Sequence, residues 1–188
     1  MKKTIAMLAL AAAILTTAGL ASADGYSQGT VSIAPSGGAY ALLNKNTTSL
    51  VTYGLDLGYF VVDGLELGVR GQGVYLTTQF SDPFSGSNNS EHFNGGGGEG
   101  FARWHFYQFD NNAGSVFAEV GAGVLWFTDT VTKWNSGSQF SGLAGLGVSY
   151  ALGQHVNLVV SANYRHIGSF DSTGIDGLGG VLGLKFTF

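Results

Sequence analysis

The sequence ends in the stretch GLGGVLGLKFTF, residues 177–188. Its alternate positions differ in character: one set is apolar or glycine and ends in two aromatic residues, while the other is small or polar and includes Lys185. The first set is Leu178, Gly180, Leu182, Leu184, Phe186 and Phe188. Strict alternation over this length predicts a β-strand whose two faces meet different surroundings. An apolar outer face that ends in aromatic residues is typical of a transmembrane β-barrel strand.

Seven segments upstream predict seven more strands. The eight predicted strands span residues 26–34, 48–60, 65–79, 97–109, 115–128, 138–151, 156–168 and 177–188. Long polar stretches and short turns connect them alternately, as external loops and periplasmic turns do in outer-membrane barrels. Pro35 is expected to end the first strand and Pro83 to lie in a long loop at 80–96, because proline interrupts a strand ladder. The fold class predicted from this pattern is all-β, an eight-stranded antiparallel transmembrane β-barrel.

The charged residues inside the predicted strands all occupy the alternate positions that face the lumen, which we call the inward parity. They are Asp56, Glu66, Arg70, Glu99, Arg103, Glu119, Arg165 and Lys185. Four are acids and four are bases, so we expect them to pair across the lumen, whereas a basic residue facing lipid at mid-membrane costs roughly 2–4 kcal/mol. A soluble lipocalin-like barrel, the alternative fold, would have the opposite pattern, with polar residues outside and apolar residues inside. Eight strands leave a lumen that side chains fill, which disfavours a pore for large solutes.

The N-terminal residues have the pattern of a secretory signal peptide. A basic start (MKK, residues 1–3) precedes an apolar run at 5–20 and a small-residue cleavage site, ASA, at 21–23. We therefore expect residues 1–23 to be cleaved and residues 24–188 to form one barrel domain. After residue 23 no apolar run approaches the ~20 residues that a membrane helix needs.

Composition excludes several kinds of chemistry. The chain has no cysteine, so a disulfide, a thiolate metal site and a cysteine nucleophile are all excluded. A formal net charge of −4 argues against binding to nucleic acid. His92, His105 and His155 share no common face with paired carboxylates, so we expect neither a metal nor a cofactor.

One ionisable residue breaks the apolar pattern of the outward face. The outward set of strand 156–168 ends, at its external end, in Tyr164 and His166. Asp176 has the same parity at the start of the next strand, so the hairpin is expected to bring it close to His166. In such a pair, at the level of the lipid headgroups, the histidine can act as a general base and the acid can orient its ring. The substrate of a site on this face would be a membrane lipid. The alternative is an ordinary interfacial histidine beside a loop-end acid, because the membrane rim tolerates polar groups.

Four stretches resemble the PagL-type lipid A 3-O-deacylases, which are acyloxyacyl-hydrolase-like barrels. They are GFARWHF at 100–106, FAEVGAG at 117–123, YRHI at 164–167 and GID at 174–176, within a likeness that runs from about residue 53 to the end. The final phenylalanine also resembles the C-terminal signature of bacterial outer-membrane proteins. The resemblance to the deacylases implies an eight-stranded barrel with a Ser-His-acid triad on its lipid-facing wall, which removes an ester-linked acyl chain from lipid A.

The chain departs from that family at the nucleophile. In the family motif the histidine is followed by any residue, then serine and asparagine, and later by a Pro-Gly-hydrophobic-acid segment. His166 matches the base and Asp176 the acid, but Gly168 stands at the serine position and Ser169 at the asparagine position. A triad without its hydroxyl loses the covalent step. Ser169 can supply the missing hydroxyl only if a β-bulge turns its side chain, which has the inward parity, toward the outer face. Ser172 is a more distant candidate for the nucleophile.

Two functional hypotheses follow, and a third is disfavoured. The first is a non-enzymatic small barrel, similar to OmpA/OmpX-type or porin-family domains, with a structural envelope role or contacts through its external loops. The second is a lipid A ester hydrolase that uses His166, Asp176 and Ser169. The third, a narrow channel, conflicts with the paired lumen charges. In each case we expect a monomer in the bacterial outer membrane, with lipopolysaccharide and its lipid A as lipid partners and no nucleic acid.

Overall fold

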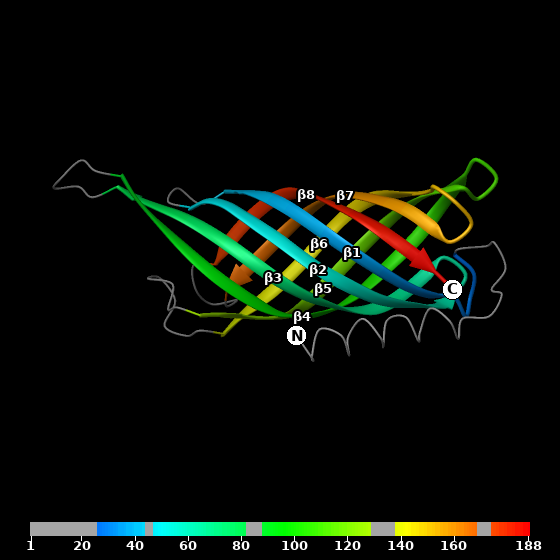
Figure 1. The fold of residues 1–188 in the computed structure, drawn as a ribbon, viewed down its shortest axis with the longest axis horizontal. Helices are drawn as coiled ribbons and strands as arrows, with labels where there is room; N and C mark the ends of the chain where they lie inside the picture. Colours follow the sequence, from blue (N-terminus) through cyan, green and yellow to red (C-terminus); the bar gives the residue numbers. More distant parts are fainter. Residues whose placement is uncertain (1–25, 44–46, 82–87, 129–137, 169–173) are drawn as a thin grey trace, which may run out of the picture.

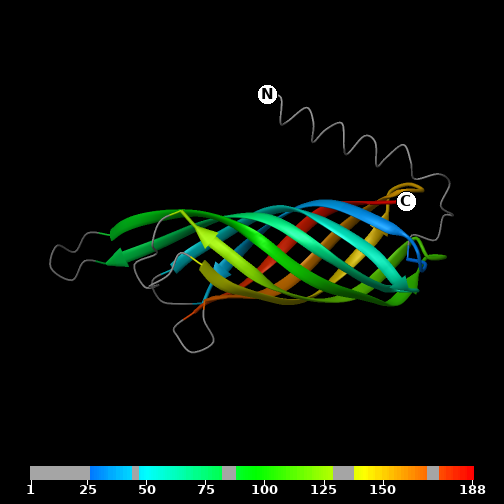
Figure 2. The same ribbon diagram turned by 90° about the horizontal axis from the view of Figure 1, so that it is seen from below.

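The protein is a closed barrel of antiparallel strands in which each strand pairs with its sequence neighbours and β1 closes onto β8 (Figures 1 and 2). The structure, a computed structural model, describes residues 26–43, 47–81, 88–128, 138–168 and 174–188. The strands are β1 Val31–Leu42, β2 Thr47–Val62, β3 Leu65–Ser81, β4 Asn88–Phe109, β5 Gly114–Phe127, β6 Ser138–Ala151, β7 Val156–Gly168 and β8 Ile175–Thr187. Within these ranges no helix is long and apolar enough to span a membrane. The predicted fold class is confirmed.

The first strand differs from its prediction. We expected it at 26–34 with Pro35 at its end, but β1 runs Val31–Leu42 and contains Pro35. Pro35 pairs with Leu55 of β2, while the pairing of β1 with β8 is interrupted there, between Ile33 and Ser36. Proline has no backbone N–H to donate to a neighbouring strand. A strand therefore accepts proline where the hydrogen bonding to one neighbour is already interrupted.

The predicted loop at 80–96 is also largely wrong, because β3 extends to Ser81 and β4 begins at Asn88. These two strands pair continuously as far as Ser81 and Asn88, and their hairpin reaches beyond the other strands at the left of Figure 1. The segment is polar and rich in glycine, which suggested a loop. Continuous pairing with β3 outweighs those weak local preferences.

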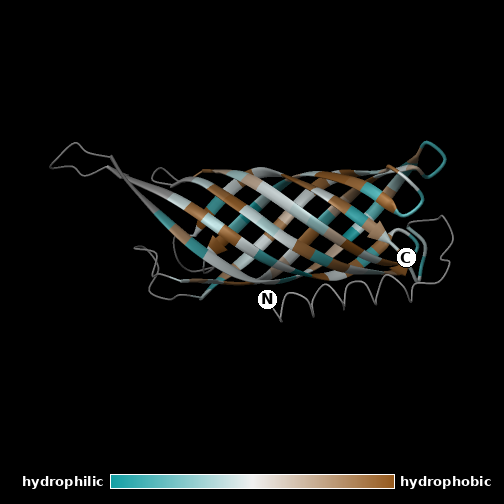
Figure 3. Cartoon of the chain, in the orientation of Figure 1, coloured by the Kyte–Doolittle hydropathy of each residue, from teal (hydrophilic) through white to brown (hydrophobic). Residues whose placement is uncertain are grey.

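The outer wall is apolar over the middle of the barrel, as predicted. Tyr53 is 63% exposed, and Trp104 and Val120 are each 59% exposed, although all three are large apolar or aromatic residues. Their strand neighbours point inward, so hydropathy alternates along each strand (Figure 3). A closed barrel with this face outward is stable only in lipid, since water would surround a continuous apolar surface.

The eight charged residues predicted to face inward all do so, and each is at most 7% exposed. Arg70 donates to both carboxylate oxygens of Asp56 at 2.7 and 2.8 Å and to Glu119 at 2.8 Å. Arg103 donates to Glu119 at 2.7 Å and to Glu66 at 3.0 Å. Arg70 and Arg103 therefore each touch more than one acid, and the central lumen is filled by a connected network of ion pairs.

The network extends toward both ends of the barrel. On the periplasmic side Lys185 donates to Glu66 at 3.0 Å, and Ser32 donates to the other oxygen of the same carboxylate. On the external side Arg165 donates to Glu99 at 2.8 Å. This arrangement confirms the prediction that the four acids and four bases pair across the lumen.

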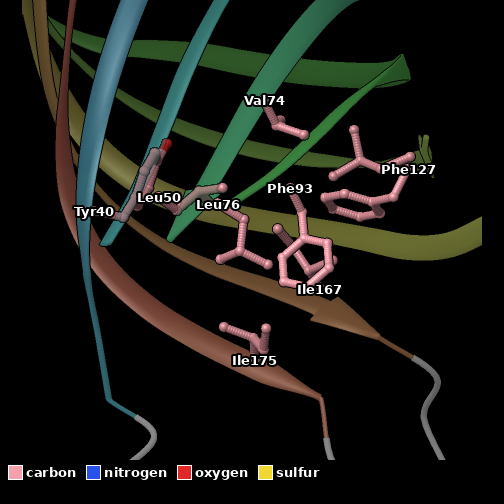
Figure 4. Close-up of a cluster of buried hydrophobic side chains, with 9 residues drawn as sticks. Tyr40, Leu50, Val74, Leu76, Phe93, Phe127, Ile167 and Ile175 are labelled. Carbon is pink, nitrogen blue, oxygen red and sulfur yellow. The ribbon is translucent and has the colours of Figure 1, made fainter. Parts of the chain in front are cut away.

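An apolar cluster fills the external part of the lumen, which was not predicted (Figure 4). This external apolar cluster consists of Tyr40, Leu50, Val74, Leu76, Phe93, Leu125, Phe127, Ile167 and Ile175. At the same level the outer face is mixed: Ser49, Thr77 and Asn94 are polar, whereas Tyr75 and Trp126 are exposed aromatic residues. Apolar side chains therefore replace the ion pairs inside this end of the barrel, while polar residues begin to appear outside. The hydrophobic effect favours apolar side chains inside wherever water reaches the outer face.

The periplasmic end is closed by the segment that precedes β1. Tyr26 is 4% exposed, and its ring lies 4.6 Å from the ring of His105 and 6.1 Å from that of Phe60. The backbone N–H of Gly64 donates to the carbonyl of Tyr26 at 2.8 Å. Aromatic rings, ion pairs and aliphatic side chains therefore fill the lumen in successive layers from the periplasmic end to the external end.

Candidate functional site on the outer wall

His166 and Asp176 face each other across the β7–β8 hairpin. The two residues are directly opposite in the strand register. The Nδ1 atom of His166 lies 2.8 Å from Oδ1 of Asp176. The side chains are 24% and 35% exposed, on the outer face of the barrel. The contact predicted from the sequence is therefore present.

Tyr164 belongs to the same cluster, which the sequence pattern did not indicate. Its hydroxyl donates to Oδ1 of Asp176, the oxygen that also contacts His166. The backbone carbonyl of Asp176 accepts a hydrogen bond of 2.8 Å from the N–H of Leu43 at the end of β1. Asp176 is thus held by three neighbours, and its carboxylate orients both a tyrosine and a histidine. The one sequence feature that could have indicated Tyr164 as a partner of Asp176 was its position two residues before His166, on the same outward face.

The cluster lies at the external boundary of the apolar wall. On β7 and β8 the outward residues below it are apolar, as in Val160, Ala162, Leu178 and Leu182. Tyrosine and histidine side chains suit this zone, because their rings are partly apolar and their polar atoms can reach water.

Gly174, the residue before β8, is packed tightly against the histidine. The Nε2 atom of His166 is buried, and a side chain added at Gly174 would overlap the imidazole ring. Gly168 has a φ of 148°, and a Cβ atom there would lie 2.6 Å from Cα of Gly174. Gly168 is therefore a position where this hairpin cannot accommodate the side chain of a serine without rearrangement.

Comparison with solved structures identifies the class of fold. The outer-membrane protein OprG from Pseudomonas aeruginosa matches with a TM-score of 0.65 and 11% identity, covering 88% of this chain and 98% of its own. Neisserial surface protein A matches with a TM-score of 0.62 and 15% identity, covering 86% and 98%. This chain is a small outer-membrane-type β-barrel. The N-terminal barrel domain of Pseudomonas aeruginosa OprF matches at a TM-score of 0.51 and 22% identity, covering 86% and 98%.

The matches to this small barrel include natural bacterial outer-membrane proteins, in agreement with the predicted location, and also designed transmembrane β-barrels. The outer-membrane enzyme PagL is among the matches, with 17% identity, coverage of 81% and 98%, and a TM-score of 0.49, which is too low to support an argument about function. No protein-family model matches the sequence, and no functionally curated protein matches it.

The predicted nucleophiles cannot be placed. Ser169 and Ser172 both lie outside the described residues. The structure therefore brings together the base and the acid of the predicted site, His166 and Asp176, while the role of Ser169 stays a prediction. With Asp176 on Nδ1, the ring directs Nε2 toward Gly174. In a triad of this kind Nε2 is the atom that accepts a proton from the nucleophile.

Proposed function

We propose that this protein is a sealed integral barrel of the bacterial outer membrane with a structural role in the envelope. The observation that carries the proposal is the filled lumen, in which eight charged side chains pair across the barrel. A conducting pore needs a continuous water-filled path, and side chains fill this narrow barrel instead. In this proposal the outer surface and the external loops carry the structural role in the envelope. The barrel is a monomeric anchor surrounded by outer-membrane lipids.

Internal space near the network is small. The two cavities beside Arg70 have volumes of about 10 and 20 Å³. A cavity of about this size holds roughly one water molecule. The external apolar cluster adds a further obstacle to ions, because an apolar constriction loses its water.

Two measurements test the sealed-barrel proposal. Purified protein reconstituted in a planar lipid bilayer is expected to give no stable conductance steps, because the ion-pair network and the external apolar cluster block the lumen. Deletion of the gene is expected to increase the uptake of an apolar fluorescent dye through the outer membrane, with recovery when the wild-type chain is supplied. Stable single-channel conductance would refute a sealed lumen, and an unchanged envelope after deletion would contradict the structural role.

A second candidate function, hydrolysis of an acyl ester in lipid A, is favoured by one observation. His166 and Asp176 lie 2.8 Å apart on the lipid-facing wall at its external boundary. Lipid A occupies the outer leaflet, so its ester groups would lie close to this level. In this candidate Asp176 orients the ring, His166 accepts a proton from a serine hydroxyl, and the serine oxygen attacks the ester carbonyl. The bond between the acyl carbon and the oxygen of the lipid A sugar then breaks, the sugar alcohol leaves with the proton from His166, and water hydrolyses the acyl-enzyme to release the fatty acid. Ser169 is the proposed nucleophile and Ser172 the alternative.

Mass spectrometry of lipid A tests this candidate. If the chain is a hydrolase, cells that express it are expected to show lipid A that lacks one hydroxyacyl chain, and His166→Ala and Ser169→Ala are each expected to abolish the change. His92→Ala is a matched control, because His92 also lies on the outer wall and stacks on Tyr75 at 5.5 Å, away from β7 and β8. Unchanged lipid A with a folded and inserted barrel would reject the hydrolase and leave the structural role.

A further inference from the structure

The periplasmic mouth of the barrel carries a polar pocket that neither proposed function uses. Its volume is about 210 Å³, and its lining consists of Tyr26, Ser27, Asp63, Gln108 and Asn112. These residues come from three separate parts of the chain: the segment before β1, the β2–β3 turn, and the end of β4 with the turn that follows. The pocket thus depends on the closed barrel rather than on one local motif.

The β4–β5 turn adopts an uncommon backbone conformation that brings Asn112 into the lining. Asp110, Asn111 and Asn112 have φ values of 55°, 51° and 69°. Three consecutive left-handed residues are rare, because most side chains clash there and only asparagine, aspartate and glycine visit the region readily. The turn is held by the N–H of Ala113, which donates to the carbonyl of Asp110 at 3.0 Å, and by the hydroxyl of Tyr150, which donates to the Asp110 carboxylate at 2.8 Å.

A β-bulge places the second carboxamide. The register between β4 and β5 shifts between His105 and Tyr107, so that Gln108 pairs with the inward residue Ser115. Without the bulge, simple alternation from Trp104 would direct Gln108 to the lipid face. The bulge therefore brings a polar side chain to the mouth, while Tyr107 becomes 59% exposed on the outer wall.

Asp63 and the N-terminal segment complete the pocket. The Oδ1 atom of Asp63 accepts a hydrogen bond of 2.7 Å from the backbone N–H of Gln28, which ties the N-terminal segment to the β2–β3 turn. Tyr26, buried beneath, separates the pocket from the lumen. A carboxylate has four lone-pair sites on two oxygens, so Asp63 keeps acceptor capacity for a ligand.

The lining selects for a neutral ligand with several hydrogen-bonding groups. Each carboxamide both donates and accepts, the carboxylate accepts, and the serine hydroxyl does both. Among the described residues, the lining includes one acid and no basic side chain, so an anionic ligand would lack a counter-charge there. An acetamido group has one N–H donor and one C=O acceptor, so it can pair with the carboxamide of Gln108 or Asn112. We propose that this pocket binds one sugar residue of a neutral, N-acetylated glycan at the periplasmic face. Drug-sized ligands occupy pockets of about 300 Å³ or more, so a single ring fits this volume better than an extended molecule.

Titration of the barrel in detergent micelles with chitotriose, a neutral N-acetylated trisaccharide, tests the proposal. We expect saturable binding by NMR, with the side-chain amide signals of Gln108 and Asn112 shifting. The double variant Asp63→Asn with Asn112→Gly is expected to weaken binding by about tenfold or more, because it removes a charged acceptor and an amide. Glycine at 112 keeps the left-handed backbone, so the turn is preserved.

The controls separate sugar recognition from charge and from misfolding. His155→Ala, in the neighbouring β6–β7 turn outside the pocket lining, is expected to bind chitotriose as the wild type does. Heat modifiability on gels reports whether each variant is folded. Absence of chitotriose binding to the folded wild type, or equal binding by the double variant, overturns the proposal. Binding of only the deacetylated, cationic trisaccharide also overturns it, because the pocket would then recognise charge through Asp63.

Discussion

Replacing Glu66 by glutamine is expected to lower the free energy of unfolding by about 3–5 kcal/mol, which is the usual effect of removing one partner from a buried ion pair. Glu66 is 0% exposed and lies 3.0 Å from both Lys185 and Arg103. Glutamine keeps the size of the side chain but leaves the two cations without this anion in a filled lumen. The loss comes from uncompensated buried charge rather than from a cavity.

Urea unfolding of the barrel in lipid vesicles, followed by tryptophan fluorescence, measures the effect. The double variant Glu66→Gln with Lys185→Met is the informative control, since it removes one cation together with the anion. It is expected to recover part of the stability that the single variant loses, whereas Gln154→Ala in an exposed turn is expected to change little. If the single variant is as stable as the wild type, the lumen contains enough water to solvate the cations and the sealed barrel is wrong.

Replacing Phe117 by alanine is expected to destabilise the barrel by about 3–5 kcal/mol, the range for truncating a fully buried aromatic residue. Phe117 is 0% exposed, and its ring lies 5.0 Å from the guanidinium carbon of Arg103 and 5.3 Å from the ring of His105. A Cβ at Gly147 would lie 2.8 Å from Cε1 of Phe117, so the facing strand carries glycine to make room for the ring. Alanine would leave that space empty.

The neighbouring residue provides the matched control for this prediction. Val116→Ala changes an outward residue on the same strand and is expected to cost about 1 kcal/mol or less, because no lumen cavity forms. Phe117→Leu is expected to fall between the two, since it keeps part of the volume. Equal effects of Phe117→Ala and Val116→Ala in the same unfolding assay would show that the two faces of β5 are not packed differently.

The positions where prediction failed share a cause. Proline and polar residues predicted a strand end at Pro35 and a polar loop at 80–96, but Pro35 and residues 88–94 belong to strands that pair with an adjacent strand of the sheet. A bulge is likewise a property of two strands together, so alternation could not place Gln108 at the mouth. Local propensity is weak in β-structure, and pairing across the sheet decides such cases.

The candidate site was predictable in part. Parity and the shortness of the hairpin were enough to predict the contact between His166 and Asp176, because opposite residues in a hairpin share a face. Tyr164 was not predicted as a partner, since its hydroxyl reaches Asp176 diagonally across the strands. Ser169 lies outside the described residues, so its proposed role as nucleophile stays a prediction.

The sequence by itself determined the membrane-facing surface, the inward charges and the count of strands, because a period of two is recorded in every strand whatever its partners are. Tertiary structure decided which acid meets which base, where apolar side chains replace the ion pairs in the lumen, and how Tyr26 closes the periplasmic end. Those features require the register between strands and the closure of β1 onto β8, which bring together residues more than a hundred positions apart, as with Lys185 and Glu66. A local pattern of residues does not indicate which residues so far apart along the chain will be in contact.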